Sequence, residues 1–229
     1  MKSIRSASVS GKRVLVRVDF NSLPVKPYEV RIEKTIPTLK YLLSKNAEVI
    51  LLTHLETNNG TIPSTRILLP YLKKRLPMDR IVLFENLRKF PGEKKNDLSF
   101  AKKLASMGDI YVNEAFSASH RKHASIVLLP KFLPSYSGFL FDEEIKKLSK
   151  VFKPPHPFTL ILGGGKIETK LPILKHFLPK LDNVILGGIL LNLYITGKKS
   201  LPSKKIILPK EVIIEGKRVL DVGPKSFPE

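Results

Sequence analysis

The chain has 229 residues, of which 42% are hydrophobic, enough to bury the core of one domain or one and a half. It has no cysteine, which excludes disulfides and thiolate metal sites, and 40 Lys and Arg stand against 20 Asp and Glu, a net charge of +20. No apolar run approaches the roughly 20 residues that cross a bilayer, and the N-terminal residues lack a signal-peptide pattern. We therefore expect a soluble, cytoplasmic protein without a membrane partner.

The positive charge leaves three interpretations open. Lysines on solvated helix faces, a site for small phosphorylated molecules, and binding to nucleic acid all fit a net charge of +20. The lysines are scattered through amphipathic segments, and no zinc-finger spacing or aromatic-rich RNA-binding signature occurs, which disfavours nucleic acid. Composition alone does not choose among the three.

The first part of the chain predicts a parallel α/β domain. Short apolar runs typical of buried strands lie at 13–18, 47–53, 80–84 and 109–113. Amphipathic segments at 33–45 and 97–107 have helical spacing, and Asn96 or Asp97 can cap the second. Alternation of strand and helix predicts right-handed crossovers and helices on both faces of the sheet, a Rossmann-like three-layer sandwich.

A second, incomplete α/β domain follows a proline-rich connector. Three prolines within residues 153–157 break any helix and favour an extended segment. The alternation then restarts, with strands expected at 158–164, 183–188, 205–209 and 218–223 and helices near 168–178 and after 188. We predict domains over 1–152 and 158–229, the second with too little helix cover for an independent core.

Polar and basic residues follow the four strands predicted in the first domain. In strand order they are Asp19 and Asn21, then His54, then Arg88, then His120, Arg121 and His123. Ligands of open parallel sheets bind beyond these strand ends, and Arg31, just ahead of the first long helix, joins the set. Each residue alone is as well explained by a solvated loop. Together they predict a site for a small phosphorylated or carboxylated ligand.

A second candidate site is the segment GGGKIETK at 163–170. A glycine run between a strand and a helix lets backbone N–H groups approach phosphate, aided by the helix dipole. Lys166 and Lys170 can share one helix face, and Pro172 indicates that the helix begins nearby, since proline suits a first turn. The spacing is not that of a Walker A motif. Glycine pairs alone indicate only tight turns.

Several strings together resemble phosphoglycerate kinase in order and spacing. They include VRVDFN (16–21), RIEKTIPTLKYLL (31–43), ENLR (85–88), YVNEAFSASHRKHAS (111–125), ILGGGKIETK (161–170) and NVILGGI (183–189). The resemblance touches nearly the whole chain. The HR-x-H-AS and GG-x-K-x-x-x-K patterns are specific in combination, although neither would suffice alone.

The resemblance implies a first domain that binds 3-phosphoglycerate or 1,3-bisphosphoglycerate. The residues at matching positions are Asp19, Asn21, Arg31, His54, Arg88, His120 and Arg121. Arg88 and Arg121, with His54, would hold the 3-phosphate, and Asp19 and Asn21 would orient the hydroxyl and carboxyl groups. Arg31 would guide the acyl-phosphate end, where charge develops as the phosphoryl group passes to or from ADP in glycolysis.

The resemblance also implies that the second domain binds ATP or ADP. The matching nucleotide-binding positions are Gly163, Gly164, Lys166, Lys170, Gly187 and Gly188. Lys166 would lie near the phosphoryl group in transit, as a catalytic residue together with Arg31. Mg²⁺ is expected with the nucleotide. Its family ligand belongs to a C-terminal part that this sequence lacks, so no metal ligand is predicted here.

The sequence departs from the family pattern in three places. The family follows its strand-end histidine with Gly-Arg-Pro, whereas this chain has Glu56, Thr57 and Asn58, which implies weaker substrate binding. The stretch from Thr57 to Ile81 is short, and the sequence ends before the Gly-Gly-Asp-Thr loop. We therefore expect a truncated or minimal phosphotransferase that binds better than it catalyses alone, with a second chain as one source of the remainder. The alternatives are a non-catalytic phospho-ligand-binding protein on this scaffold and a basic nucleic-acid-binding protein.

Overall fold

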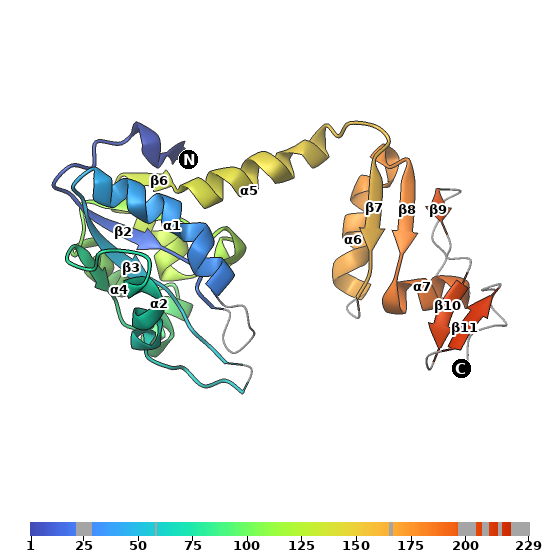
Figure 1. Ribbon diagram of the computed structural model, residues 1–229, viewed down its shortest axis with the longest axis horizontal. Helices are drawn as coiled ribbons and strands as arrows, with labels where there is room; N and C mark the ends of the chain where they lie inside the picture. The colour runs from blue at the N-terminus through green and yellow to red at the C-terminus, as the bar shows by residue number, and fades with distance from the viewer. Residues whose placement is uncertain are drawn as a thin grey trace. The chain divides into compact units, whose positions relative to one another are not determined.

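The computed structural model describes residues 1–21, 29–57, 59–164, 167–196, 205–207, 211–214 and 217–220. The chain divides into two compact units, Met1–Leu148 and Ser149–Glu229, here called unit 1 and unit 2 (Figure 1). Residues 153–158 contain neither helix nor strand. The domain limits drawn from the sequence, with their proline-rich connector, stay predictions.

Unit 1 is built on a six-stranded sheet in which every pair of neighbouring strands is parallel, in the order β1-β6-β5-β2-β3-β4. The strands are β1 (Lys2–Ser3), β2 (Arg13–Arg17), β3 (Glu48–Leu52), β4 (Ile81–Leu83), β5 (Ile110–Asn113) and β6 (Ser135–Ser137). The four predicted strands are confirmed as β2 to β5. The predicted parallel α/β architecture is confirmed with two further strands at one edge.

Five α-helices accompany this sheet in the described residues of unit 1. They are α1 (Glu29–Ser44), α2 (Leu69–Lys73), α3 (Pro91–Lys94), α4 (Leu98–Ala105) and α5 (Phe139–Ser149), and α5 ends at the unit boundary. The predicted cap of α4 is Asp97, whose Oδ1 accepts a hydrogen bond from the Phe100 amide at 2.7 Å. This bond satisfies one of the free N–H groups of the first helical turn.

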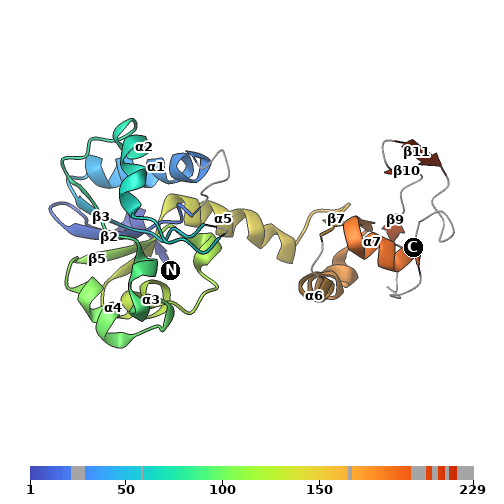
Figure 2. The same cartoon turned by 90° about the horizontal axis from the view of Figure 1, so that it is seen from below.

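Helices cover both faces of the unit 1 sheet, because successive side chains of a strand point to opposite faces. Val14 and Val16 of β2 belong to a buried cluster that includes residues of α1 and α2. Leu15, between them, belongs to a second cluster with Leu104 of α4. Figure 2 shows α1 and α2 on one side of the strands and α3 and α4 on the other. The predicted three-layer arrangement is confirmed.

Unit 2 contains a smaller parallel sheet in the order β7-β8-β9 and a separate antiparallel pair of strands. Its elements are β7 (Thr159–Leu162), α6 (Ile167–Phe177), β8 (Asn183–Leu186), α7 (Gly188–Ile195), β9 (Ile206–Ile207), β10 (Glu211–Ile214) and β11 (Lys217–Leu220). The predicted helix near 168–178 is confirmed as α6. The last two predicted strands, 205–209 and 218–223, lie partly outside the described residues.

The two faces of the β7-β8-β9 sheet differ in burial. Val184 lies on the face that packs against α6 and α7 and has no exposed surface. On the opposite face Ile161, Ile185 and Ile207 are neighbours in register, and their residues are 75%, 37% and 48% exposed. We call these three side chains the isoleucine row.

Pro172 does not lie where the sequence predicted. The helix α6 begins at Ile167, so Pro172 falls in its second turn rather than its first. A proline there has no N–H to donate to the carbonyl of Glu168, so the helix loses one backbone hydrogen bond at that point. The expectation of a first-turn proline is therefore wrong, although the start of the helix is close to the predicted one. No helix of the described residues is long and apolar enough to span a membrane.

Candidate active site

Parallel strands of unit 1 bring the predicted basic residues to one edge of the sheet. His54 follows β3, Arg88 follows β4 and Arg121 follows β5. The Arg121 Nη1 atom lies 3.3 Å from His54 Nε2, and the charges of both arginines act on the His54 ring. We call Arg17, His54, Arg88 and Arg121 the rim cluster. The fold of unit 1 thus brings His54, Arg88 and Arg121 close together, as the sequence predicted.

Arg17, which the sequence analysis did not single out, is the most deeply buried member of the rim cluster. It is the last residue of β2 and is completely buried. Its Nη2 atom is 3.0 Å from His54 Nδ1, and its Nε donates to Ser125 Oγ at 3.0 Å. Ser125 in turn donates from its Oγ to the buried carboxylate of Glu93 at 2.7 Å. The signal in the sequence was an arginine between Val16 and Val18, inside the otherwise apolar run 14–18.

These contacts define the protonation state of His54. Guanidinium groups can only donate, and a neutral imidazole accepts at one nitrogen only, so one of the contacts with Arg17 and Arg121 is a hydrogen bond and the other is not. We assign Nδ1 as the acceptor because its distance from the buried Arg17 is the shorter, 3.0 Å against 3.3 Å, and we place the ring proton on Nε2. Burial, and then the charges of Arg17, Arg88 and Arg121, lower the pKa of His54 to about 2, although Asp19 acts in the opposite direction. The neutral ring therefore presents an Nε2–H donor beside the donors of Arg121. One acceptor that lies to the side of two donors 3.3 Å apart, such as an oxyanion oxygen, can accept from both of them.

Arg88 is held by polar contacts from three neighbouring segments. Its Nε donates to Glu56 Oε2 at 3.2 Å, its Nη1 lies 3.4 Å from His123 Nδ1, and its amide donates to Asn86 Oδ1 at 3.0 Å. Burial, and then the charges of Arg88 and Arg121, lower the pKa of His123 to about 4. His123 is therefore neutral near pH 7 and can accept from Arg88.

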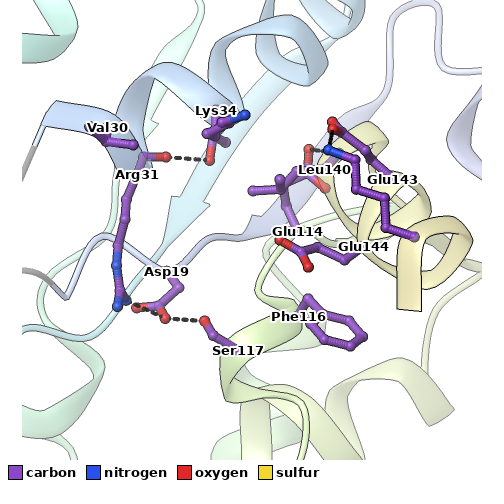
Figure 3. Close-up of a pocket in the computed structure, with 12 residues that line it drawn as sticks. Asp19, Val30, Arg31, Lys34, Glu114, Phe116, Ser117, Leu140, Glu143 and Glu144 are labelled. Atoms are coloured by element: carbon purple, nitrogen blue, oxygen red, sulfur yellow. Dashed lines mark hydrogen bonds and ion pairs between the residues drawn. The ribbon is translucent and has the colours of Figure 1, made fainter. Parts of the chain in front are cut away.

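Asp19 and Arg31 form a second polar group at the same edge. Arg31 Nη1 donates to Asp19 Oδ2 at 2.7 Å, and the Ser117 hydroxyl donates to the same oxygen (Figure 3). The Asn21 amide donates to Asp19 Oδ1 at 3.1 Å. Burial opposes ionisation of Asp19, but these donors hold its pKa below the usual value. The Asn21 side chain accepts from the Glu56 amide at 2.8 Å and so links this group to the loop after β3.

A pocket of about 500 Å³ adjoins the Asp19–Arg31 pair. Its walls come from α1, α5 and the loop after β5, and they include Lys34, Glu114 and Phe116 (Figure 3). Neither His54, Arg88 nor Arg121 lines it. The pocket therefore lies beside the rim cluster, and the donors that suit an oxyanion are outside it.

The structure does not test two predicted site residues, His120 and Lys166, in the same way. His120 is exposed, and no hydrogen bond or ion pair among the described residues joins it to the rim cluster. Lys166 lies outside the described residues. Their predicted contacts with substrate and with the transferring phosphoryl group stay predictions.

In unit 2 the two predicted glycine pairs pack against each other. Gly163 and Gly164 follow β7, and Gly187 and Gly188 follow β8. A Cβ atom on Gly188 would lie 3.2 Å from the Gly164 nitrogen, and one on Gly163 would lie 3.4 Å from the Gly187 backbone. Gly164 and Gly188 also have positive φ angles of 113° and 58°. Backbone geometry therefore favours glycine at Gly164 and Gly188, with close approach adding to it at Gly188, whereas a Cβ at Gly163 would make only an ordinary contact and one at Gly187 would meet nothing within 4 Å.

Lys170 of α6 is the described basic residue nearest to this glycine turn. Its Cε would lie 3.8 Å from a Cβ on Gly164, so the side chain passes close to the turn. No group of three or more His, Cys, Asp or Glu side chains that could hold a metal ion occurs in the part of the chain that the structure describes.

The sequence profile of one family, described as phosphoglycerate kinase, matches residues 4–78 and 70–225 of the chain. The chain belongs to this family. The phosphoglycerate kinase of Wolbachia sp. is 40% identical over 227 residues, which cover 86% of this chain and 56% of that protein. That of Finegoldia magna is 36% identical over 264 residues, covering 99% of this chain and 66% of that protein.

Solved phosphoglycerate kinase structures have the same fold. The enzyme of Pyrococcus horikoshii OT3 superposes with a TM-score of 0.79 at 25% identity, covering 96% of this chain and 71% of that chain. That of Coxiella burnetii superposes with a TM-score of 0.73 at 27% identity, covering 90% of this chain and 59% of that chain. This chain spans 56% of the length of the Wolbachia protein and 66% of the length of the Finegoldia protein.

Proposed function

We propose that unit 1 is the triose-phosphate half of a phosphoglycerate kinase, which binds 3-phosphoglycerate and 1,3-bisphosphoglycerate. The observation that carries the proposal is the pair of donors at His54 Nε2 and Arg121 Nη1, 3.3 Å apart, which an oxyanion oxygen satisfies. Arg88 adds a guanidinium that is already held in place by its neighbours. A prepared set of charged donors binds phosphate without first having to order flexible side chains.

In this proposal the three-carbon ligand extends from the rim cluster toward Asp19 and Arg31. Its 3-phosphate lies at Arg88, Arg121 and the Nε2–H of His54. Asp19 and Asn21 orient the hydroxyl and carboxyl groups, and Arg31 stabilises charge that develops on the acyl phosphate during transfer. His120, which is exposed at the same loop, is a further substrate contact.

Unit 2 is proposed to bind ATP or ADP at its two glycine turns. A backbone without Cβ atoms lets phosphate oxygens approach N–H groups closely. Gly163, Gly164, Gly187 and Gly188 supply that backbone, and Lys170 supplies a charge beside it. Mg²⁺ would accompany the nucleotide and neutralise its phosphates. The reaction would be reversible phosphoryl exchange in cytoplasmic glycolysis.

Calorimetric titration of the chain with 3-phosphoglycerate tests the binding site. Replacing Arg121 by alanine removes charge-assisted hydrogen bonds and should weaken binding about tenfold or more, since such bonds contribute about 1.5–3 kcal/mol. The matched control is Lys122→Ala, which removes the same charge from an exposed neighbour and should leave the affinity within about twofold. Equal affinities in the two variants would contradict the proposed site.

A coupled assay with ATP, Mg²⁺ and 3-phosphoglycerate tests catalysis separately. Turnover that Arg121→Ala lowers and Lys122→Ala does not would support a kinase. Saturable binding without turnover would support the alternative, a non-catalytic phospho-ligand-binding protein on this scaffold. Equal losses of DNA affinity in both variants, with no binding of 3-phosphoglycerate, would support a nucleic-acid-binding protein instead.

A further inference from the structure

Glu56 forms an ion pair with Arg88 but is not among the ligand-binding residues assigned above. Glu56 follows β3, two residues after His54. Its Oε2 accepts from Arg88 Nε at 3.2 Å, and its Oε1 lies 3.7 Å from Lys94 Nζ. Its backbone amide donates to Asn21 Oδ1 at 2.8 Å, so the main chain at this point is held in place. The carboxylate therefore lies between two cations at the edge of the rim cluster.

The two members of the Glu56–Arg88 pair differ in their freedom to move. The side chain of Arg88 is 2% exposed, whereas that of Glu56 is 35% exposed. Pairs with an exposed partner are individually weak because water and salt screen them. Arg88 is thus fixed, and the Glu56 carboxylate can be displaced from it by another anion.

We propose that Glu56 is an internal counter-anion of the rim cluster, which competes with the ligand's phosphate for Arg88. This inference rests on the proposed function in so far as the natural ligand is a triose phosphate. Glu56 accepts from the Nε of Arg88 and neutralises part of the positive charge of the rim cluster. A phosphate dianion that binds there therefore lacks one hydrogen-bond donor and is repelled by the Glu56 carboxylate. Glu56 thereby lowers the affinity of the rim cluster for phosphate and for ligands that carry a phosphate group.

A purely orienting role for Glu56 predicts a different outcome. If the carboxylate only kept Arg88 in position, any replacement would leave phosphate binding unchanged or weaken it. Glu56→Gln separates the two roles, since the amide oxygen can still accept from Arg88 Nε while the negative charge is gone. Glu56→Asn gives a second neutral variant with a shorter side chain.

The experiment titrates the chain with inorganic phosphate and, separately, with 3-phosphoglycerate. Both Glu56 variants should bind each ligand about threefold to tenfold more tightly than the parent chain. The matched control is Glu48→Gln, which removes one negative charge from an exposed residue at the opposite end of β3. Its affinities should equal those of the parent.

Unchanged or weaker phosphate binding in both Glu56 variants would overturn the inference. Failure of phosphate to bind any of the chains would also overturn it, because there would be no oxyanion site for Glu56 to occupy. Tighter phosphate binding in the variants, combined with 3-phosphoglycerate binding no better than phosphate, would support the inference and count against the proposed function. The two proposals therefore fail in distinguishable ways.

Discussion

Arg17 joins a buried carboxylate to the candidate phosphate site. Its guanidinium contacts Ser125, which bonds to Glu93, and on its other side it contacts His54. Replacement by methionine keeps the apolar part of the side chain but removes the guanidinium charge that interacts with the completely buried Glu93. We expect Arg17→Met to lower the free energy of unfolding by about 3–5 kcal/mol, as measured by urea denaturation.

Arg13, four residues earlier on the same strand, provides the control. Its pair with Asp109 lies at the surface, with side chains that are 46% and 35% exposed. Arg13→Met should hardly move the urea midpoint, because exposed pairs contribute little. Equal shifts for the two variants would show that Arg17 acts as an ordinary surface charge.

The lowered pKa of His54 predicts how stability depends on pH. An unfolded histidine titrates near pH 6.5, whereas burial and the arginine charges lower the pKa of His54 to about 2. The unfolded chain therefore binds more protons below pH 6.5. The contribution of His54 to stability is complete above that pH and is lost as the pH falls, by at most about 1.4 kcal/mol per pH unit.

Urea denaturation of the parent and of His54→Gln between pH 7 and pH 5 measures this contribution. The glutamine oxygen can still accept from Arg17, but the side chain does not titrate. We expect stability to fall less steeply with decreasing pH in this variant than in the parent. His176→Gln, at an exposed position of unit 2, should retain the parent's slope, and a parental slope in His54→Gln would contradict the assignment of a neutral buried ring.

At the scale of the elements, the sequence predicted the strands β2 to β5, including the short edge strand β4, and missed β1 and β6. Residues 13–18 and 47–53 contain continuous apolar runs, which indicate a strand covered on both sides. The strands β1 and β6 have two and three residues, too few for any periodicity. They are stabilised by pairing with each other and, for β6, with β5, which is tertiary information.

The candidate site was predictable where polar residues directly follow a strand. His54, Arg88 and Arg121 were found in this way, because parallel strands all end at one edge of the sheet. Arg17, Glu93 and Ser125 were missed because their roles depend on burial beneath that edge. Glu56 was noticed only as a departure from the family pattern, and its pairing with Arg88 required the fold.

The isoleucine row makes a prediction about the small sheet of unit 2. Ile185 is exposed on one face of β8, whereas the adjacent Val184 is buried on the other. Ile185→Thr should reduce binding of a hydrophobic dye with little change in stability, since it removes apolar surface from water contact. Val184→Thr places a hydroxyl in the core and should cost about 1–3 kcal/mol in the free energy of unfolding. Comparable destabilisation by both substitutions would mean that the isoleucine row is covered in solution.

At the scale of the whole molecule, the described cores belong to separate units. The buried clusters of unit 1 draw on residues from Ile4 to Leu129, and the cluster of unit 2 draws on residues from Leu162 to Ile195. A fragment of residues 1–152 contains both clusters of unit 1 and all four residues of the rim cluster. We expect it to unfold cooperatively and to bind 3-phosphoglycerate with an affinity within about threefold of the whole chain.

Circular dichroism during urea denaturation and calorimetric titration of this fragment are the two measurements. Arg121→Ala in the same fragment is the control for specific binding. A fragment that folds but does not bind would place part of the site in unit 2. A fragment without a cooperative transition would show that unit 1 needs unit 2 for its stability.

The position of β1 has a consequence for biosynthesis. Lys2 and Ser3 pair with Tyr136 and Ser137 of β6, so β1 waits for a partner strand that is made more than a hundred residues later. At roughly 5–20 residues per second, the interval on a ribosome is roughly 7–27 seconds. In the last part of that time β2 to β5 have been made but β6 has not, which leaves β5 with an open edge to which a chaperone or a neighbouring nascent chain has access.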